Sequence, residues 1–309
     1  MNDQHKFSMH ISDFWIMAAG MVTTALALLG VYLLSHVDGD FNIMGWYALF
    51  IIPAGAILVG IAAGSGYGLV SWLMGRKVNG SLLAIILVLL VIGYGSAQYV
   101  EFTGMQKEYP TLRQISFFQY YDVSTRSMTF SLSRSKTSTG ELGILGYLFR
   151  FLELAGFAVG GLVIPLMLKS KAYCEGCGVY MRKKDIWWLA AAVPNRKIPK
   201  KDTAALNAYA EEMKSAFENG MNVSQLLIKA ARERNIPAFQ EIIARALPVK
   251  EAQKLEHRIE VRLNTCPRCS DGIFIATLHS GHGDKSRSEK IAGQPVDSGF
   301  TRSIPPATA

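Results

Sequence analysis

Four cysteines carry the clearest chemistry in this 309-residue chain. They form two pairs with the same spacing, Cys174-x-x-Cys177 in CEGC and Cys266-x-x-Cys269 in CPRC. A thiolate pair at this spacing, held in a tight turn, binds one metal ion through both sulfur atoms, and two such turns complete a tetrahedral site. The pattern therefore predicts that all four cysteines bind a single Zn²⁺ ion.

A redox role for the cysteines is the alternative. A redox C-x-x-C motif is typical of a single βαβ setting, whereas here the motif occurs twice and outside such a setting. Disulfides are disfavoured in the cytoplasm, where the charge pattern described below places both pairs. We therefore favour a metal site.

Segments with strand-like patterns flank both cysteine pairs. GVYMRKKDIWWLAAAV follows the first pair and reads as a hairpin that turns near Lys184 and Asp185. HRIEVRLNT precedes the second pair and GIFIATLHS follows it, with the alternating apolar residues typical of strands. Two cysteine knuckles joined to hairpin strands resemble the zinc-ribbon fold, over residues 172–192 and 257–280. The resemblance implies a metal-stabilised scaffold and no particular activity.

The gap between the two cysteine pairs is much longer than in a compact ribbon, and its sequence predicts helices. Asp202 is suited to cap a first helix, and Gly220 is suited to end it. We therefore expect a small cytoplasmic α+β module over residues 169–280 with a helical insert at 201–256. The polar tail, residues 281–309, is expected to be disordered.

The chain that precedes the cysteines is dominated by apolar runs. A transmembrane helix needs about 20 mainly apolar residues, and four segments qualify. Residues 1–168 are therefore expected to form an α-helical membrane domain with an external loop over residues 99–142. The expected spans are residues 14–34, 44–74, 81–97 and 143–168.

Charge is divided unevenly along the chain, whose net charge is +8. Lys and Arg number 9 in residues 1–168 and 23 in residues 169–309, against 9 and 15 for Asp and Glu. Cytoplasmic loops of membrane proteins carry an excess of Lys and Arg. Arg76 and Lys77 between the second and third spans, and the basic segment after the fourth, indicate that both termini are cytoplasmic. We expect a multi-pass protein of the bacterial inner membrane.

Two charged residues lie inside a predicted span. Arg150 and Glu153 are three residues apart, so they share one helix face and can form an ion pair. An ionisable pair within a membrane is by default a hypothesis of a functional site. The alternative is that Arg150, near the outer end of its helix, extends to the lipid headgroups.

Glycines recur at intervals of four residues in two of the predicted spans. They are Gly60, Gly64 and Gly68 in the second span and Gly156 and Gly160 in the fourth. Small residues at this spacing let helix backbones approach closely in lipid. We expect packing within one bundle, and contact between copies in a homo-oligomer is the alternative.

These features favour a non-enzymatic scaffold or adaptor that docks a cytosolic protein partner. No set of nucleophile and base is recognisable in the cytosolic part. The arrangement also resembles uncharacterised bacterial membrane proteins that carry a zinc ribbon after their last helix, which implies no activity.

Two other functions remain open. A small oligomeric channel or transporter would use Arg150, Glu153, Gln98 and Glu101 as its polar path. A membrane-tethered nucleic-acid-binding protein would use Trp187 and Trp188 with the preceding basic residues Arg182, Lys183 and Lys184. For these tryptophans and basic residues, we favour contact with anionic lipid headgroups over nucleic acid.

Overall fold

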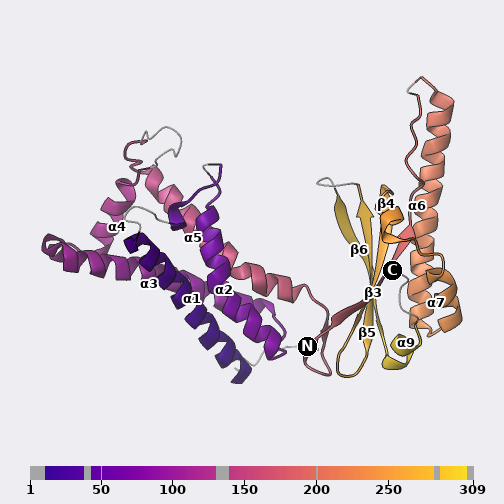
Figure 1. Cartoon of the computed structure of the whole chain (residues 1–309), viewed down its shortest axis with the longest axis horizontal. Coiled ribbons are helices and arrows are strands. Elements are labelled where there is room, and N and C mark those ends of the chain that lie inside the picture. Colours follow the sequence, from indigo (N-terminus) through magenta and orange to yellow (C-terminus); the bar gives the residue numbers. More distant parts are fainter. Residues whose placement is uncertain are drawn as a thin grey trace, which may run out of the picture. The chain divides into compact units, whose positions relative to one another are not determined.

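The chain divides into two compact units, residues 1–171 and 172–309. The structure is a computed structural model that describes residues 11–37, 43–49, 51–129, 139–199, 201–281 and 286–304. Figure 1 shows that the first unit is helical and that the second combines a sheet with helices.

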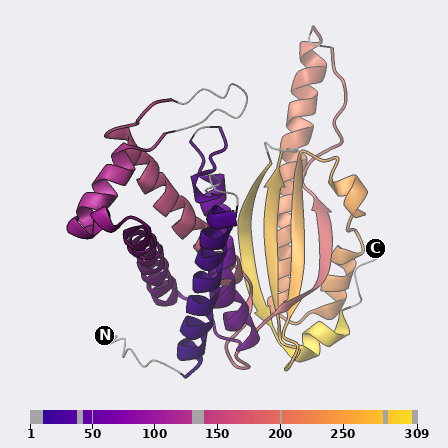
Figure 2. The same ribbon diagram turned by 60° about the vertical axis from the view of Figure 1, so that its left-hand side comes forward.

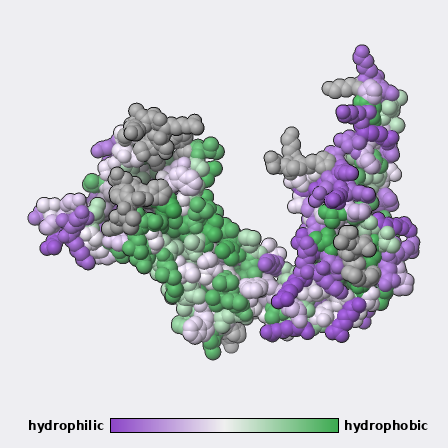
Figure 3. Space-filling model, in the orientation of Figure 1, coloured by the Kyte–Doolittle hydropathy of each residue, from purple (hydrophilic) through white to green (hydrophobic). Residues whose placement is uncertain are grey.

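Four helices of the first unit are long and apolar enough to cross a membrane, with mean hydropathies from 1.6 to 2.2. Many large apolar side chains of these helices point outward, and Figure 3 shows apolar residues gathered over the surface of this unit. Such a surface suits a helix bundle surrounded by lipid, because helices satisfy their own backbone hydrogen bonds. The helices are α1 (Ile11–Val37), α2 (Ala54–Leu73), α3 (Gly80–Glu108) and α5 (Leu145–Lys169).

The second helix starts later than the predicted span of residues 44–74. Residues 43–45 form a short 3₁₀ turn, η1 (Ile43–Gly45), and Ala48 forms a bridge with Ile52. α2 begins only after Pro53. A proline has no N–H to donate and disfavours helical backbone in the residue before it, which explains this boundary.

Much of the segment predicted as an external loop is helical. α3 continues to Glu108, beyond the predicted end at residue 97. It is followed by the 3₁₀ helix η2 (Pro110–Gln114) and by α4 (Phe117–Arg126), which Ser116 and Gln119 cap reciprocally. With 29 residues, α3 is about 43 Å long and exceeds the hydrocarbon thickness of about 30 Å.

α2 and α5 pack against each other through the predicted glycines. A Cβ atom on Gly60 or Gly64 would overlap a backbone oxygen of α5, and one on Gly160 would overlap a backbone oxygen of α2. Gly68 lies in the same helix–helix contact, against Ile164 of α5, and Gly156 of α5 approaches Pro53, the residue that precedes α2. The glycines therefore serve close packing within one chain.

The second unit contains a four-stranded antiparallel sheet of order β3-β4-β5-β6 and a separate two-stranded hairpin, β1-β2. α6 and α7 cover one face of the sheet (Figure 2). The strands are β1 (Tyr173–Cys174), β2 (Val179–Tyr180), β3 (Arg182–Ala190), β4 (His257–Thr265), β5 (Gly272–Ser280) and β6 (Arg287–Val296). The helices are α6 (Thr203–Arg232), α7 (Ile236–Ile243), α8 (Val249–Ala252) and α9 (Ser298–Ser303).

The core of this unit joins strands and helices that are far apart in sequence. Leu227 from α6, Phe239 from α7, Val261 from β4 and Phe274 from β5 are all fully buried in one cluster. The helices predicted as an insert are therefore part of the same core as the strands that flank the cysteines.

The prediction of a hairpin that turns near Lys184 and Asp185 is wrong. β3 runs straight through this point, with a bulge between Lys183 and Asp185 in its pairing with β4. The alternation of side chains along β3 then places Trp187 in the core, 4% exposed, against Phe239 and Phe274. Trp187 is thus not available to lipid headgroups or nucleic acid.

The predicted stop of the first insert helix at Gly220 is also wrong. α6 begins after the Asp202 cap, as expected, but continues to Arg232. Gly220 instead lets the helix approach the backbone of Ala190 and Ala191 closely. Residues 203–219 precede this contact, and none of them is buried.

The prediction of disorder after residue 280 is wrong over the described residues 286–304. β6 pairs with β5 along its length, and α9 follows directly. Val296, Phe300 and Ile304, spaced four residues apart, enter the core. Because the rest of this segment is polar, its composition does not predict that these three residues pack into the core.

Candidate metal centre

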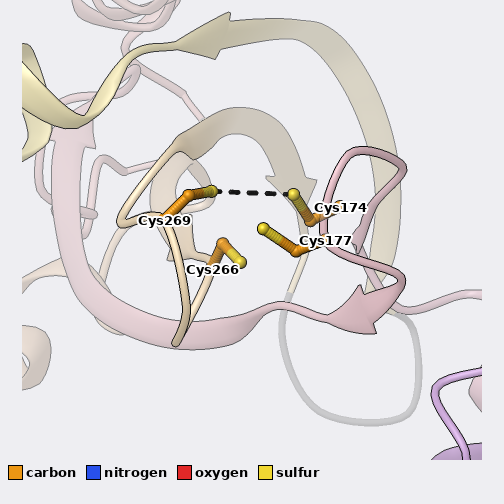
Figure 4. A group of neighbouring side chains, drawn as sticks. All are labelled: Cys174, Cys177, Cys266 and Cys269. Atoms are coloured by element: carbon orange, nitrogen blue, oxygen red, sulfur yellow. Dashed lines mark hydrogen bonds between the residues drawn. The ribbon is translucent and has the colours of Figure 1, made fainter.

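The four cysteine sulfur atoms converge at one point, each within 4.8 Å of the others (Figure 4). The Sγ atoms of Cys174 and Cys269 are 3.8 Å apart. A tetrahedral metal with metal–sulfur bonds of about 2.3 Å would hold its sulfurs about 3.8 Å apart. The cysteines that the sequence pairs in two distant motifs therefore form one cluster that can bind a metal ion.

Two turns of the same geometry position the sulfur atoms. In the first, the N–H of Gly178 donates to the carbonyl oxygen of Cys174 over 2.9 Å, and in the second Ser270 donates to Cys266 over 3.0 Å. Gly178 and Ser270 occupy the same place after their motifs, and both have a positive φ, +63° and +66°. Each turn thereby closes on its own first cysteine.

Contacts between the turns hold them together. The guanidinium of Arg268 donates to the carbonyl oxygen of Cys177 over 3.1 Å, which links the second turn to the first. The backbone N–H of Arg268 also points to the Cys266 sulfur, at 3.4 Å. Such N–H groups stabilise a thiolate, the form that binds metal.

Two hydrogen bonds from α9 hold the second turn in place. The hydroxyl of Thr301 donates to the carbonyl oxygen of Ser270, and the N–H of Ser298 donates to a carboxylate oxygen of Asp271 over 3.0 Å. The other oxygen of Asp271 accepts from the Cys269 thiol over 3.2 Å. Sequence reasoning missed Asp271, Ser298 and Thr301, because only the packing of α9 brings them to the cysteines.

Two thiols of the second turn, those of Cys266 and Cys269, have pKa values shifted in opposite directions. Burial raises the pKa of Cys266, but the backbone N–H groups of Cys269 and Arg268 outweigh it and lower the pKa to about 7. At Cys269 the backbone N–H of Asp271 lowers the pKa, yet burial and the Asp271 carboxylate prevail and raise it. Cys266 is therefore the thiol that loses its proton more easily, and Cys269 is the one that must be deprotonated for metal to bind.

The donor set suits a structural metal better than a catalytic one. Four sulfur ligands fill a tetrahedral metal and leave no position for water or substrate. Cys174 and Cys266 are buried, and Cys177 and Cys269 are half-buried, so the cluster lies at the edge of the unit.

The predicted intramembrane pair lies in the other unit. Arg150 Nη1 is 3.3 Å from Glu153 Oε2 on α5, and the two side chains are 11% and 2% exposed. The Arg150 guanidinium also lies over the Tyr121 ring of α4, 5.9 Å from its centroid. Arg150 is therefore enclosed by the helices of its own unit.

No protein-family model matches the chain, and neither a curated protein nor a solved structure matches it. The assignment of the cysteine cluster as a metal site therefore rests on its geometry.

Proposed function

We propose that this chain is a multi-pass protein of a bacterial inner membrane whose zinc-stabilised cytoplasmic unit docks a cytosolic protein. The basic excess after residue 168 and the Arg76–Lys77 pair support cytoplasmic termini. Four sulfur donors at tetrahedral spacing support Zn²⁺, which prefers this set in structural sites. The closed donor set supports a scaffold in place of an enzyme.

We infer the docking role from the first half of α6, residues 203–219, which we call its projecting half. Figures 1 and 2 show α6 running past the end of the sheet. Residues 203–219 therefore contribute little to the core, although they extend a helix of 30 residues. Arg196 braces this half, through an ion pair with Glu212 and a contact 5.1 Å from the centroid of the Tyr209 ring. A braced helix without a core of its own offers its exposed side chains to another molecule.

Site-specific photo-crosslinking of the full chain in cells tests the docking role. A photoreactive residue at Leu206, on the projecting half of α6, should give one discrete crosslinked protein. The same residue at Arg245, exposed just after the end of α7, is the matched control and should give none. Equal crosslinking at both positions, or none at either, would contradict docking through α6.

Reporter fusions test the topology separately. A reporter fused after residue 170 should be active in the cytoplasm, and one fused near residue 120 should be active outside. The reverse pattern would place the cysteines in an oxidising compartment and remove the main argument for zinc over disulfides.

The enclosed Arg150–Glu153 pair favours a transporter as the second candidate function. Buried ion pairs in membranes mark paths for protons or substrates. Reconstituted protein should then show ion or proton flux that Glu153→Gln abolishes while insertion into the bilayer is retained. Absence of flux in the unaltered protein would leave the pair with a packing role. The nucleic-acid alternative is weaker, because Trp187 is buried.

A further inference from the structure

β6 forms one edge of the four-stranded sheet, and among the described residues no further strand pairs with it there (Figure 1). At the other edge, the N–H of Leu247 donates to the carbonyl oxygen of Trp188 in β3 over 2.8 Å. In the described part of the chain, β6 forms its backbone–backbone hydrogen bonds with β5 alone. The outward N–H and C=O groups of an edge strand are a template on which another strand can pair.

A hollow of about 260 Å³ lies beside this edge, between β6 and α6. Ile291 and Ala292 of β6 line it together with α6 residues from Ser224 to Arg232. None of the other described strands lines the hollow, so it lies at the β6 edge and not over the middle of the sheet. Small-molecule sites typically have volumes of about 300–1,000 Å³, so this hollow is small for such a ligand.

A β-bulge gives the hollow an apolar floor. The register with β5 passes from Lys290 to Ala292, so Ile291 has no residue opposite it. Ile291 and Ala292 therefore both face α6, where they pack against the core that contains Ile228. Apolar side chains of a bound molecule would be favoured against this floor.

The length of the hollow suits the side chains of an added strand. From Ser224 to Arg232, its α6 wall is about 12 Å long. Side chains on one face of a strand are about 7 Å apart, so two of them fit along this wall.

The surface around the hollow is basic. Four cations lie on α6 and β6 beside it and along the edge, namely Lys229, Arg232, Arg287 and Lys290. The acids among them are Glu289 of β6 and Glu233, whose carboxylate is 3.9 Å from the Lys229 ammonium. This excess of cations favours an acidic partner, whereas a second copy of β6 would bring further cations to the edge.

Lys290 indicates the face on which acidic side chains of a partner would lie. It is opposite Thr277, whose neighbour Ala276 is fully buried in the core beneath α6, so Lys290 points away from α6. The hollow and Lys290 are therefore on opposite faces of the edge. A strand paired with β6 alternates between these faces, so it suits the edge when apolar residues alternate with acidic ones.

We propose that the β6 edge binds an extended segment of another protein in which apolar and acidic residues alternate. The segment adds a fifth strand to the sheet through main-chain hydrogen bonds with β6. Its apolar side chains enter the hollow against Ile228 and Ile291, and its acidic side chains lie beside Lys290. Residues 203–219 of α6 take no part, so this binding is independent of the docking role proposed above.

Fluorescence anisotropy with the full chain in nanodiscs of a neutral lipid tests the proposal. The probe is a dye-labelled peptide of alternating valine and glutamate, and it should bind saturably. A peptide of alternating valine and lysine should not bind, because its charge has the same sign as that of the edge. The valine–glutamate peptide with methylated backbone nitrogens should not bind either, because it cannot donate hydrogen bonds to β6. Failure of the probe to bind, or equal binding of either control peptide, would overturn the proposal.

Variants of the chain locate the binding. Gln225→Trp fills the hollow from an exposed position of α6 and should weaken binding about tenfold. Lys290→Glu should weaken it about threefold to tenfold, the effect of reversing an exposed charge. Lys250→Glu is the matched control and should bind the probe normally, because α8 carries the same change of charge beside β3, at the other edge of the sheet. Unchanged binding in Gln225→Trp, or equal losses in Lys250→Glu and Lys290→Glu, would show that the β6 edge is not the site.

Discussion

The hydroxyl of Thr301 donates a 2.6 Å hydrogen bond to the carbonyl oxygen of Ser270, the residue that closes the second cysteine turn. Thr301 is only 1% exposed, so water does not replace this bond when it is lost. α9 is thereby attached to the metal cluster, although 31 residues separate the two partners.

Thr301→Val should therefore weaken metal binding without changing a ligand. Loss of one buried hydrogen bond costs about 1–2 kcal/mol, equivalent to a roughly tenfold fall in affinity if it acts only on the metal-bound form. Competition with a chromophoric chelator measures the affinity. Ser303→Ala is the control, because the Ser303 hydroxyl bonds only to Phe300 within α9. Equal affinities in both variants would show that α9 does not support the site.

Metal removal should loosen part of the cytoplasmic unit and spare the rest. In Cys266→Ser, or after chelation, the β1–β2 hairpin and the turn before β5 should exchange their amide hydrogens faster. Leu227, Phe239 and Val261 share a core away from the cysteines, so α6, α7 and β4 should stay protected. Hydrogen exchange with mass spectrometry distinguishes the segments. Faster exchange in α1–α5 would contradict the separation into two units.

Metal affinity should fall as the pH is lowered from about 8 to about 5, because protons compete for the sulfur atoms. Cys266, with its pKa lowered to about 7, is partly a thiolate at neutral pH, whereas the raised pKa of Cys269 keeps that thiol protonated. Binding at neutral pH should therefore release the Cys269 proton. Titration calorimetry in buffers of different ionisation enthalpy counts the protons. Metal binding without proton release would contradict this order of acidities.

Gly64→Ala should destabilise the helical unit, because the new Cβ atom would overlap a backbone oxygen of α5. Overpacking of this kind costs about 1–3 kcal/mol. Gly95→Ala in α3 is the matched control, since among the described residues no atom outside the local helix backbone lies within 4 Å of its Cβ position, and alanine favours a helix. Thermal unfolding in detergent should show a lower midpoint for Gly64→Ala alone.

The features that sequence predicts best are those that require a residue type at a fixed spacing or an apolar run of a fixed length. The spacing of Cys174 and Cys177 matches that of Cys266 and Cys269, and a metal needs all four, so the cluster follows from sequence. Apolar length likewise predicts the four long helices. Gly60 and Gly64 predict a close helix contact in the same way.

Other features depend on contacts that no local pattern encodes. β6 is polar and exposed along much of its length, and it is ordered by backbone pairing with β5. The strand direction at Lys184 is set by pairing with β4, not by turn residues. Gly220 is of a type that often ends a helix, but here its missing side chain leaves room for the backbone of Ala190. In each case, a partner distant in sequence overrides the local preference.

The two halves of the metal cluster do not exist at the same time during synthesis. Cys174 and Cys269 are 95 residues apart, and chains elongate at about 5–20 residues per second. For about 5–19 s, the first pair is therefore present without the second. During this interval the nascent chain offers an incomplete thiol site to oxidants and to other metals. We therefore expect translation speed and metal supply to influence how much of the chain folds with a complete site.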